Sequence, residues 1–348
     1  MVQIYKCPGC GGELVYESGT DRMVCPHCGR TVEISELEEK KEAGTATGLS
    51  GEEQQDNAGT GLKEFKCPSC GAAIVTDEHT SATFCSFCGN PTLIESRLSG
   101  DFKPSRLIPF AFDKKQAQTN FKTWKGTGKL TPGKFKSNAT MEKVSGMYIP
   151  CWLYSYTANA AITGEGRNVR TSQSGDTETV TTDHYNVARV IKADYENVPH
   201  DASDSMPDDS MSILEPFDYT GLREFAMPYL SGFAAERYTY TAEQLEPEVK
   251  KELEEDIVKA GIAAITEYSS FELQDKAVQF TNPNYEYVLM PIWTLIFEYA
   301  GKKYPLYMNG QTGKIDGQLP ISKVRLLIVF LLSFGIVFLI AFLIGRLL

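Results

Sequence analysis

The sequence predicts a multi-domain protein with two small zinc-ribbon β modules, an α+β globular domain and one C-terminal transmembrane helix. Three observations support this prediction. Eight of the nine cysteines form four Cys-x-x-Cys pairs before residue 90, the middle of the chain alternates helical and strand-like patterns, and an uncharged apolar run lies near its end. With 348 residues, the chain is long enough for one sizeable core and smaller modules.

The four cysteine pairs form two copies of one spacing, Cys-x2-Cys-x14-Cys-x2-Cys, in a first module at residues 1–35 and a second at 62–96. A gap of two residues lets both thiolates of a pair reach one ion, and the glycine after each second cysteine lets the chain turn beneath it. The expected ligands are Cys7, Cys10, Cys25 and Cys28 in the first module, and Cys67, Cys70, Cys85 and Cys88 in the second.

Four thiolates around one ion favour tetrahedral Zn²⁺ with no open position, as in structural sites. We therefore expect two structural zinc ions, with iron in a similar sulfur cage as the alternative. Each module is too small for an independent core, so metal binding should supply most of its folding free energy. His27 is expected to be exposed rather than a ligand, and Cys151 to be a buried thiol.

Residues 36–61 separate the two modules. They begin with a charged run and continue through Gly, Thr, Ser, Glu and Gln, with almost nothing to bury. This composition predicts a flexible linker. The alternative for its first part is a short solvated helix over residues 35–42.

The α+β globular domain is expected at residues 101–320. A helix is predicted from Asp113 to Gly126, with Ala117, Phe121 and Trp124 on its apolar face, and a second from Thr241 to Ile265. Strands are predicted at Met147–Ile162 and His184–Ala193, with a long polar loop over residues 171–178, and a strand, turn and strand at 303–315. A Pro-x-Trp core recurs at Pro150–Trp152 and Pro291–Trp293, and both tryptophans are expected in the core.

The transmembrane helix is predicted at Leu326–Ile344, nineteen residues without a charge. Such a helix is about 28 Å long, close to the thickness of the hydrocarbon core of a bilayer. Lys314, Lys323 and Arg325 precede it, and only Arg346 follows. The positive-inside bias therefore predicts a single-pass cell-membrane protein with its N-terminal bulk in the cytoplasm.

The charge distribution is polarised. The net charge of −11 disfavours nucleic acid as a partner, although residues 101–143 hold ten Lys or Arg against three acids. This basic stretch could lie against anionic lipid headgroups or be ordinary solvated surface. Residues 194–256 hold seventeen acids against four bases.

The sequence shows no recognisable catalytic constellation. There are four histidines, His27, His79, His184 and His200, none with the spacing of a catalytic metal site. No nucleophile elbow is present. We therefore expect that the protein is not an enzyme and has no small-molecule substrate.

The repeated Cys-Pro-x-Cys-Gly knuckle is similar to the zinc ribbons of general transcription factor IIB and of the primosomal replication helicase. The rest of the chain resembles a bacterial family of membrane-anchored, TFIIB-type zinc-ribbon proteins, the YdjG-like proteins. The segments that carry this resemblance are Ile108–Phe110, Tyr148–Trp152, Pro291–Trp293 and Met308–Lys314. The resemblance implies an integral membrane partner for membrane-stress or membrane-organising proteins of the PspA and SPFH types.

From these features we expect a membrane-anchored adaptor that docks other membrane or membrane-associated proteins. The bilayer and two zinc ions are its other expected partners. The alternative is a membrane-tethered nucleic-acid-binding protein, which the ribbon type and the basic stretch would favour.

Overall fold

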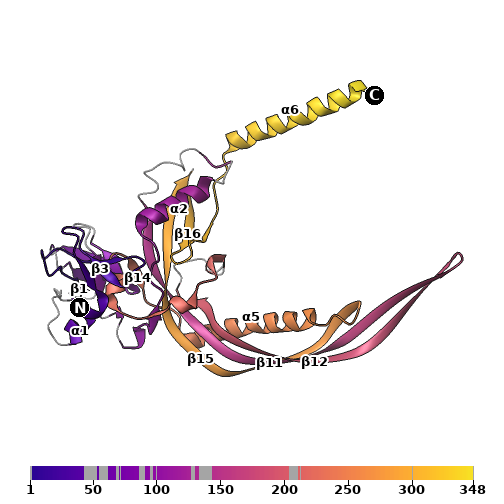
Figure 1. Cartoon of the computed structure of the whole chain (residues 1–348), viewed down its shortest axis with the longest axis horizontal. Coiled ribbons are helices and arrows are strands. Elements are labelled where there is room, and N and C mark those ends of the chain that lie inside the picture. Colours follow the sequence, from indigo (N-terminus) through magenta and orange to yellow (C-terminus); the bar gives the residue numbers. More distant parts are fainter. Residues whose placement is uncertain are drawn as a thin grey trace. The chain divides into compact units, whose positions relative to one another are not determined.

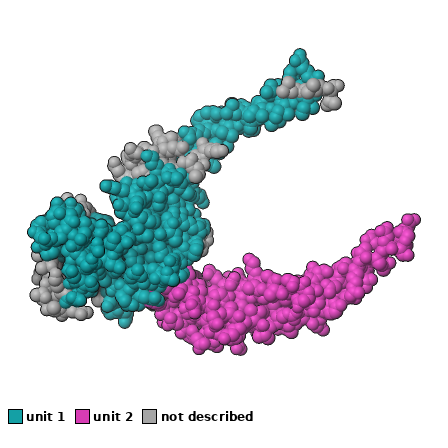
Figure 2. All heavy atoms as spheres, in the orientation of Figure 1, with its two compact units in different colours: residues 1–150, 203–237, 289–348 teal, residues 151–202, 238–288 magenta. Residues whose placement is uncertain are grey.

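The computed structural model describes residues 2–42, 53–54, 62–67, 70, 72–85, 91–94, 97–98, 100–126, 130–132, 143–203, 211, 213–299 and 301–347. The chain divides into two compact units (Figure 2). Unit 1 comprises residues 1–150, 203–237 and 289–348, and unit 2 comprises residues 151–202 and 238–288. Unit 1 thus includes both cysteine modules and part of the globular domain.

The first cysteine module contains a three-stranded antiparallel sheet of β2 (Val15–Glu17), β3 (Arg22–Val24) and β4 (Thr31–Glu33). One residue at the centre of each strand, Tyr16, Met23 and Val32, is buried, as expected when alternate side chains face a core. Helix α1 (Ile34–Glu42) follows directly. It covers the start of the expected linker, and its buried Ile34 and Leu37 show that this part is packed.

The second cysteine module contributes to two sheets. β5 (Glu53–Gln54), β6 (Leu62–Lys66) and β7 (Ala73–Asp77) form one. β8 (Thr80–Phe84) and β9 (Pro91–Ile94) belong to the large sheet of eleven described strands, where β8 pairs with β14 (Ala234–Glu236) and β9 with β1 (Val2–Gln3). The strand at the start of the first module, ahead of its first cysteine, therefore pairs with the second module. Apart from α1 and β5, the expected linker lies outside the described residues.

Besides the C-terminal helix and the ends of the long strands, the remainder of unit 1 contains short strands and a further α-helix. Its elements are β10 (Arg106–Leu107), α2 (Lys114–Gly126), β13 (Arg223–Glu224), β16 (Lys302–Asn309) and β17 (Ile315–Gly317). Asp113 and Gln116 exchange backbone-to-side-chain hydrogen bonds of 2.9 and 2.8 Å at the start of α2. This capping interaction confirms the predicted helix start.

Three long strands dominate the fold: β11 (Ser145–Ser174), β12 (Thr177–Asp201) and β15 (Ser270–Tyr299) (Figure 1). β11 and β12 pair in antiparallel register down to Ser174 and Thr177, and Gly175 turns the chain at a φ of +63°. The predicted loop over residues 171–178 is wrong, because most of it is paired strand. Its polarity reflects a two-stranded ribbon exposed to solvent rather than an irregular loop.

In unit 2, helix α5 (Ala242–Ala263) packs on one face of the strands. Gln244 Oε1 accepts the backbone N–H of Thr241 at 2.8 Å, as expected for the predicted start of this helix. Its buried residues recur at Leu245, Val249, Leu253 and Ile257, one turn apart. They pack against the inward side chains of β11, which include Tyr154, Tyr156, Ala158, Ala160 and Ile162.

The two Pro-x-Trp motifs lie where the long strands pass from one unit to the other. The boundary between the units falls after Pro150 in β11 and before Leu289 in β15. Trp293 is 2% exposed, in the core of unit 1. Trp152 is half-buried in unit 2 and donates its indole N–H to the carbonyl of Tyr240 at 2.9 Å.

Helix α6 (Lys323–Leu347) closes the chain. Its mean hydropathy reaches 3.2, so the helix is long and apolar enough to cross a membrane. The large apolar side chains along it are exposed, including Phe330, Phe334 and Phe338, each more than 60% exposed.

Candidate metal centre

The first cysteine cluster brings together four sulfur atoms. The Sγ atoms of Cys7, Cys10, Cys25 and Cys28 all lie within 4.8 Å of one another. Cys7 and Cys28 are 3.6 Å apart, and Cys10 and Cys25 are 3.5 Å apart. A tetrahedral zinc site with Zn–S bonds of about 2.3 Å has sulfur–sulfur edges of about 3.8 Å. The cluster therefore has the size that one such ion requires.

Each cysteine pair of this cluster sits on the same backbone turn. The N–H of Cys7 donates to the carbonyl of Gly12 at 2.6 Å, and the N–H of Cys25 donates to the carbonyl of Arg30 at 2.8 Å. The residue after the second cysteine is left-handed in both turns, with φ of +71° at Gly11 and +73° at Gly29. Only glycine adopts this conformation without strain, which explains the repeated Cys-Gly dipeptide.

Backbone N–H groups in these turns also favour thiolates. The N–H groups of Cys10 and Gly9 lower the pKa of Cys7 to about 6, and the hydrogen bond from Gly9 to Cys7 Sγ is 3.4 Å long. The N–H of Cys28 similarly lowers the pKa of Cys25. The N–H of Gly12 lowers the pKa of Cys10. The contacts of the Cys10 sulfur atom with those of Cys28 and Cys25 have the opposite effect and raise this pKa to about 12. A bound cation would let all four sulfur atoms ionise together.

The second cluster has the same features where the structure describes it. The Sγ atoms of Cys67, Cys70 and Cys85 lie within 4.8 Å of one another, with Cys70 and Cys85 3.7 Å apart. The N–H of Cys67 donates to the carbonyl of Ala72 at 2.8 Å, the closing bond seen in the first module. Cys88, the fourth expected ligand, lies outside the described residues.

His27 and Cys151 are not part of either group of sulfur ligands. His27 is exposed, as expected, although its ring lies so close to Gly12 that a Cβ there would be 2.7 Å from its Cδ2 atom. The same Cβ would be 3.3 Å from the sulfur atoms of Cys10 and Cys25. A side chain at position 12 would therefore collide with the first cluster, so this position requires glycine.

Cys151 is fully buried in β11, as expected for a thiol in the core.

The first module is packed onto the rest of unit 1, a feature that the sequence did not predict. The ring of Tyr16 lies 5.2 Å from that of Tyr229 and 6.2 Å from that of Phe233. Four hydrogen bonds of 2.8 to 3.0 Å connect the two parts: Tyr229 Oη to Asp21 Oδ1, Ser231 Oγ to the carbonyl of Leu14, Tyr16 N to the carbonyl of Ser231, and Gly19 N to the carbonyl of Phe110.

This contact continues into an aromatic cluster at the centre of unit 1. Phe110 stacks on Phe233 with ring centroids 4.1 Å apart, and Tyr148 and Trp293 meet Phe110 edge-on at 5.0 and 4.9 Å. Burial raises the pKa of Tyr16 well above its usual range. Leu14 and Met23 are fully buried as well. A thirty-residue module has too few residues to bury this many apolar side chains by itself. These apolar residues were the sign in the sequence that the module packs against another part of the chain.

Arg97 supports the second module. Its guanidinium lies 4.9 Å from the centre of the Phe65 ring. It donates to Thr76 Oγ1 at 3.0 Å, to the carbonyl of Thr80 at 2.5 Å and to the carbonyl of Asp77. A single buried arginine thus joins β7, β8 and the turn between them.

The Met308–Lys314 motif has a structural role in the described residues. Buried Asn309 donates to the carbonyl of Leu214 at 3.1 Å and accepts the N–H groups of Gln311 and Thr312 at 2.8 and 2.9 Å. Gln311 then bonds both the N–H and the carbonyl of Asp218, at 2.7 and 2.8 Å. The motif therefore holds the segment around residues 214–218.

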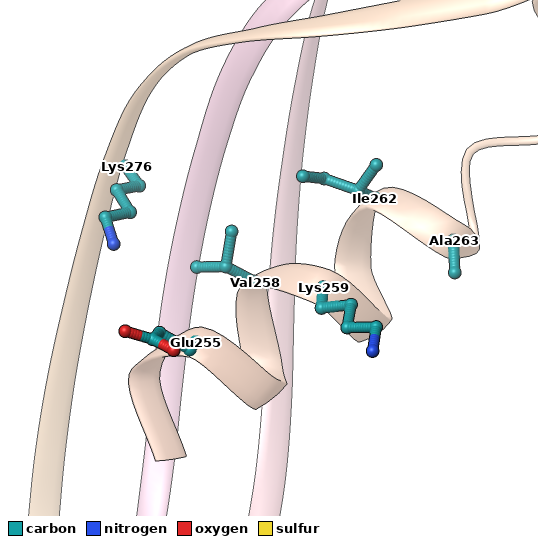
Figure 3. Close-up of a pocket in the computed structure, with 6 residues that line it drawn as sticks. All are labelled: Glu255, Val258, Lys259, Ile262, Ala263 and Lys276. Carbon is teal, nitrogen blue, oxygen red and sulfur yellow. The ribbon is translucent and has the colours of Figure 1, made fainter. Parts of the chain in front are cut away.

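Unit 2 contains a shallow groove of about 410 Å³ between α5 and β15 (Figure 3). Its apolar lining comes from Val258, Ile262 and Ala263, and Glu255, Lys259 and Lys276 border it. Lys276 is paired with Glu254 at 2.7 Å. This lining offers hydrophobic contact without the convergent polar groups that orient a small ligand.

Comparison with known proteins identifies one relative across almost the whole chain. A Bacillus subtilis (strain 168) protein, titled "Uncharacterized protein YdjG", is 34% identical over 323 residues, which cover 93% of this chain and 92% of the relative. The chain belongs to the YdjG family. No family model and no solved structure matches the chain.

Proposed function

We propose that this member of the YdjG family is a membrane-anchored adaptor whose two cysteine clusters are structural zinc sites of the TFIIB ribbon type. The observation that carries the proposal is the pair of compact thiolate clusters in a unit that also contains an exposed apolar helix. Four thiolates leave zinc no open position for a substrate. The protein would then act through its surfaces rather than through its metals.

The metal is tested by elemental analysis of the full chain purified in detergent. Two zinc ions per chain support the proposal. One or two iron atoms per chain, with the visible absorbance of iron–thiolate bonds, would show that the sites bind iron instead of zinc. Absence of bound metal from freshly purified, reduced protein would overturn the structural sites.

The membrane anchor is supported by the exposure of α6. Exposure of its apolar side chains to water costs about 25 cal/mol of free energy for each Å². Insertion of the helix into a bilayer removes this cost. Lys323 and Arg325 at its start favour a cytoplasmic location for the N-terminal bulk. Protease treatment of inside-out and right-side-out vesicles tests this orientation. Digestion of residues 1–322 should occur only in inside-out vesicles, and digestion only in right-side-out vesicles would reverse the proposal.

Partner docking is supported by the contrast in charge between the two units. Unit 2 holds eighteen acidic against eight basic residues, so −10 of the net charge of −11 lies there. The β11–β12 ribbon in the same unit exposes Val169 and Val180, at 51% and 59%. A surface of one charge attracts partners of the opposite charge, and exposed apolar side chains on it add hydrophobic contact. Membrane-stress and membrane-organising proteins of the PspA and SPFH types are the proposed partners.

Affinity capture from solubilised membranes tests the adaptor role. The full chain is compared with a carrier protein fused to residues 318–348, and with the full chain carrying Cys7→Ser and Cys67→Ser. Partners recovered only by the intact full chain support docking by the folded modules. Recovery of the same proteins by the carrier fusion would overturn the adaptor role.

A nucleic-acid-binding role is the second candidate, supported by the lysines of α2. It predicts that the full chain in detergent binds duplex DNA or RNA with an affinity that falls steeply with salt. Lack of binding at low salt would remove this candidate.

A further inference from the structure

Helix α2 is basic on one side only. Its thirteen residues include Lys114, Lys115, Lys122 and Lys125 and no acid. At 100° per residue these lysines fall within a sector of about 100°. Thr119 and Thr123 continue the exposed side next to Lys115, and Ala117 and Phe121 face the core. Lysines at this spacing on an acid-free helix have no intrahelical carboxylate to pair with.

The exposed lysines of α2 also lack ion-pair partners among the residues that the structure describes. Lys114, Lys115 and Lys122 are exposed, and none of them has a salt bridge among the described residues. By contrast, α5 contains the pair Lys250–Glu246 at 2.7 Å. The charge of α2 is therefore available to an outside partner.

Hydrogen bonds place this helix close to the start of α6. The segment that follows α2 reaches α6 at two points: Leu130 accepts the N–H of Ser322 at 2.9 Å, and Thr131 accepts Arg325 Nη1 at 2.6 Å. Gly126 and Leu130 are four residues apart, which an extended chain spans in about 14 Å. The last turn of α2 thus lies near the point where α6 would enter a membrane (Figure 1).

The other end of α2 is held as well. The N–H of Ala111 donates to the carbonyl of Gly310 at 3.0 Å, in the turn after β16. The side chain of Asn120 lies against Gly313 in the same turn, since a Cβ on Gly313 would be 3.4 Å from Asn120 Nδ2. Held just before its start and at Asn120, α2 is an anchored basic element rather than a mobile tail.

We infer that the lysine side of α2 binds the anionic headgroups of the membrane that α6 enters. The inference rests on the proposed membrane anchor. Lipid is favoured over nucleic acid because attachment to α6 keeps the lysines at the bilayer surface, where anionic headgroups are permanently concentrated. The electrostatic attraction between a lysine and the headgroups is screened within a Debye length, about 8 Å at physiological salt. A basic helix close to the point where α6 enters the membrane therefore gains the most binding free energy from it.

Lysine-specific labelling of the full chain in lipid nanodiscs tests this inference. One disc contains phosphatidylcholine alone, and the other an equal mixture of phosphatidylcholine and phosphatidylglycerol. Acetylation of each lysine is measured by peptide mass spectrometry. Lys251, exposed on α5 in the acidic unit, is the internal control.

The labelling of Lys114, Lys115 and Lys122 should fall about five-fold in the anionic disc, the factor that corresponds to the typical attraction of one base. High salt should restore the labelling, and that of Lys251 should not change. Equal labelling of the α2 lysines in both discs would overturn the inference. Protection by added duplex DNA, with no difference between the discs, would assign the lysines to nucleic acid instead.

Incorporation of the chain into the nanodiscs distinguishes a failure of the lipid-binding inference from a failure of the proposed membrane anchor. If the chain does not enter either disc, the anchor itself is wrong. If it enters both and the α2 lysines react equally, the anchor stands and only the lipid-binding role of α2 fails.

Discussion

The two cysteine modules share one spacing and differ in how the fold holds them. The first keeps its own three-stranded sheet, β2 to β4, which in the described residues makes no strand pairing with the large sheet and is attached by ring contacts and single hydrogen bonds, above all through Tyr16 packed on Tyr229 and Phe233. The second gives β8 and β9 to the large sheet, where they pair with β14 and β1. A repeated metal motif therefore specifies a local turn, while the rest of each module is free to be attached in a different way.

The largest effect should come from loss of a metal ligand. Cys25→Ser and Cys85→Ser should each reduce the zinc content from two ions to one, because a structural site contributes about 10–16 kcal/mol in isolated zinc-finger peptides. Elemental analysis measures the zinc. Limited proteolysis should then cut Cys25→Ser inside residues 7–33 and Cys85→Ser inside 67–85.

Cys151→Ala is the control for these variants, since Cys151 is buried away from both clusters and should leave two zinc ions. Two zinc ions in either ligand variant would contradict the assignment of that cluster.

Removal of the docking side chain of the first module should come next. Tyr16→Ala should lower the free energy of unfolding by about 3–5 kcal/mol, as expected for loss of a large buried aromatic ring. Denaturant unfolding of the detergent-solubilised chain measures it. The matched change in the second module is Val75→Ala, at a side chain that is 53% exposed, and should cost less than about 0.5 kcal/mol. A small effect at Tyr16 would mean that the first module is not held by its side chains.

Arg97 tests the attachment of the second module. Arg97→Gln should lower the free energy of unfolding by about 1–3 kcal/mol, because several buried acceptors lose a charged donor. Arg22→Gln is the control in the first module, where the exposed pair with Glu33 should contribute at most about 1 kcal/mol. The same denaturation measurement serves both variants, and equal effects would remove the special role of Arg97.

The smallest effect should follow Tyr229→Phe, which removes one hydroxyl and keeps the ring. Loss of its 2.9 Å hydrogen bond to Asp21 should cost about 0.5–1.5 kcal/mol, since Asp21 lies near the surface and regains water. A loss as large as that of Tyr16→Ala would show that the hydrogen bond, rather than ring packing, attaches the module.

Local patterns predicted the parts of the fold that depend on near neighbours in the chain. The Cys-x-x-Cys-Gly knuckles, the capped starts of α2 and α5 and the apolar run of α6 all depend on residues within a few positions of one another. The predicted core positions Ala117 and Phe121 are buried for the same reason.

The polar segment at residues 171–178 shows where such patterns fail. Ser and Thr there occur in loops and in solvated strands alike, and only the pairing of Ser174 with Thr177 distinguishes the two. Because both faces of the ribbon tip meet water, no apolar alternation marks the strand.

The sequence by itself determined the two cysteine clusters, the capped helices and the apolar tail, because each is encoded by short-range spacing. Only the tertiary structure decided that Val2 pairs with Ile94, that Ala82 pairs with Ala235, and that Tyr16 packs beside Tyr229. Backbone hydrogen bonds between strands use the same N–H and C=O groups whatever the side chains are. Contacts across so many residues therefore leave little trace in the sequence, and the attachment of the modules had to be seen in the fold.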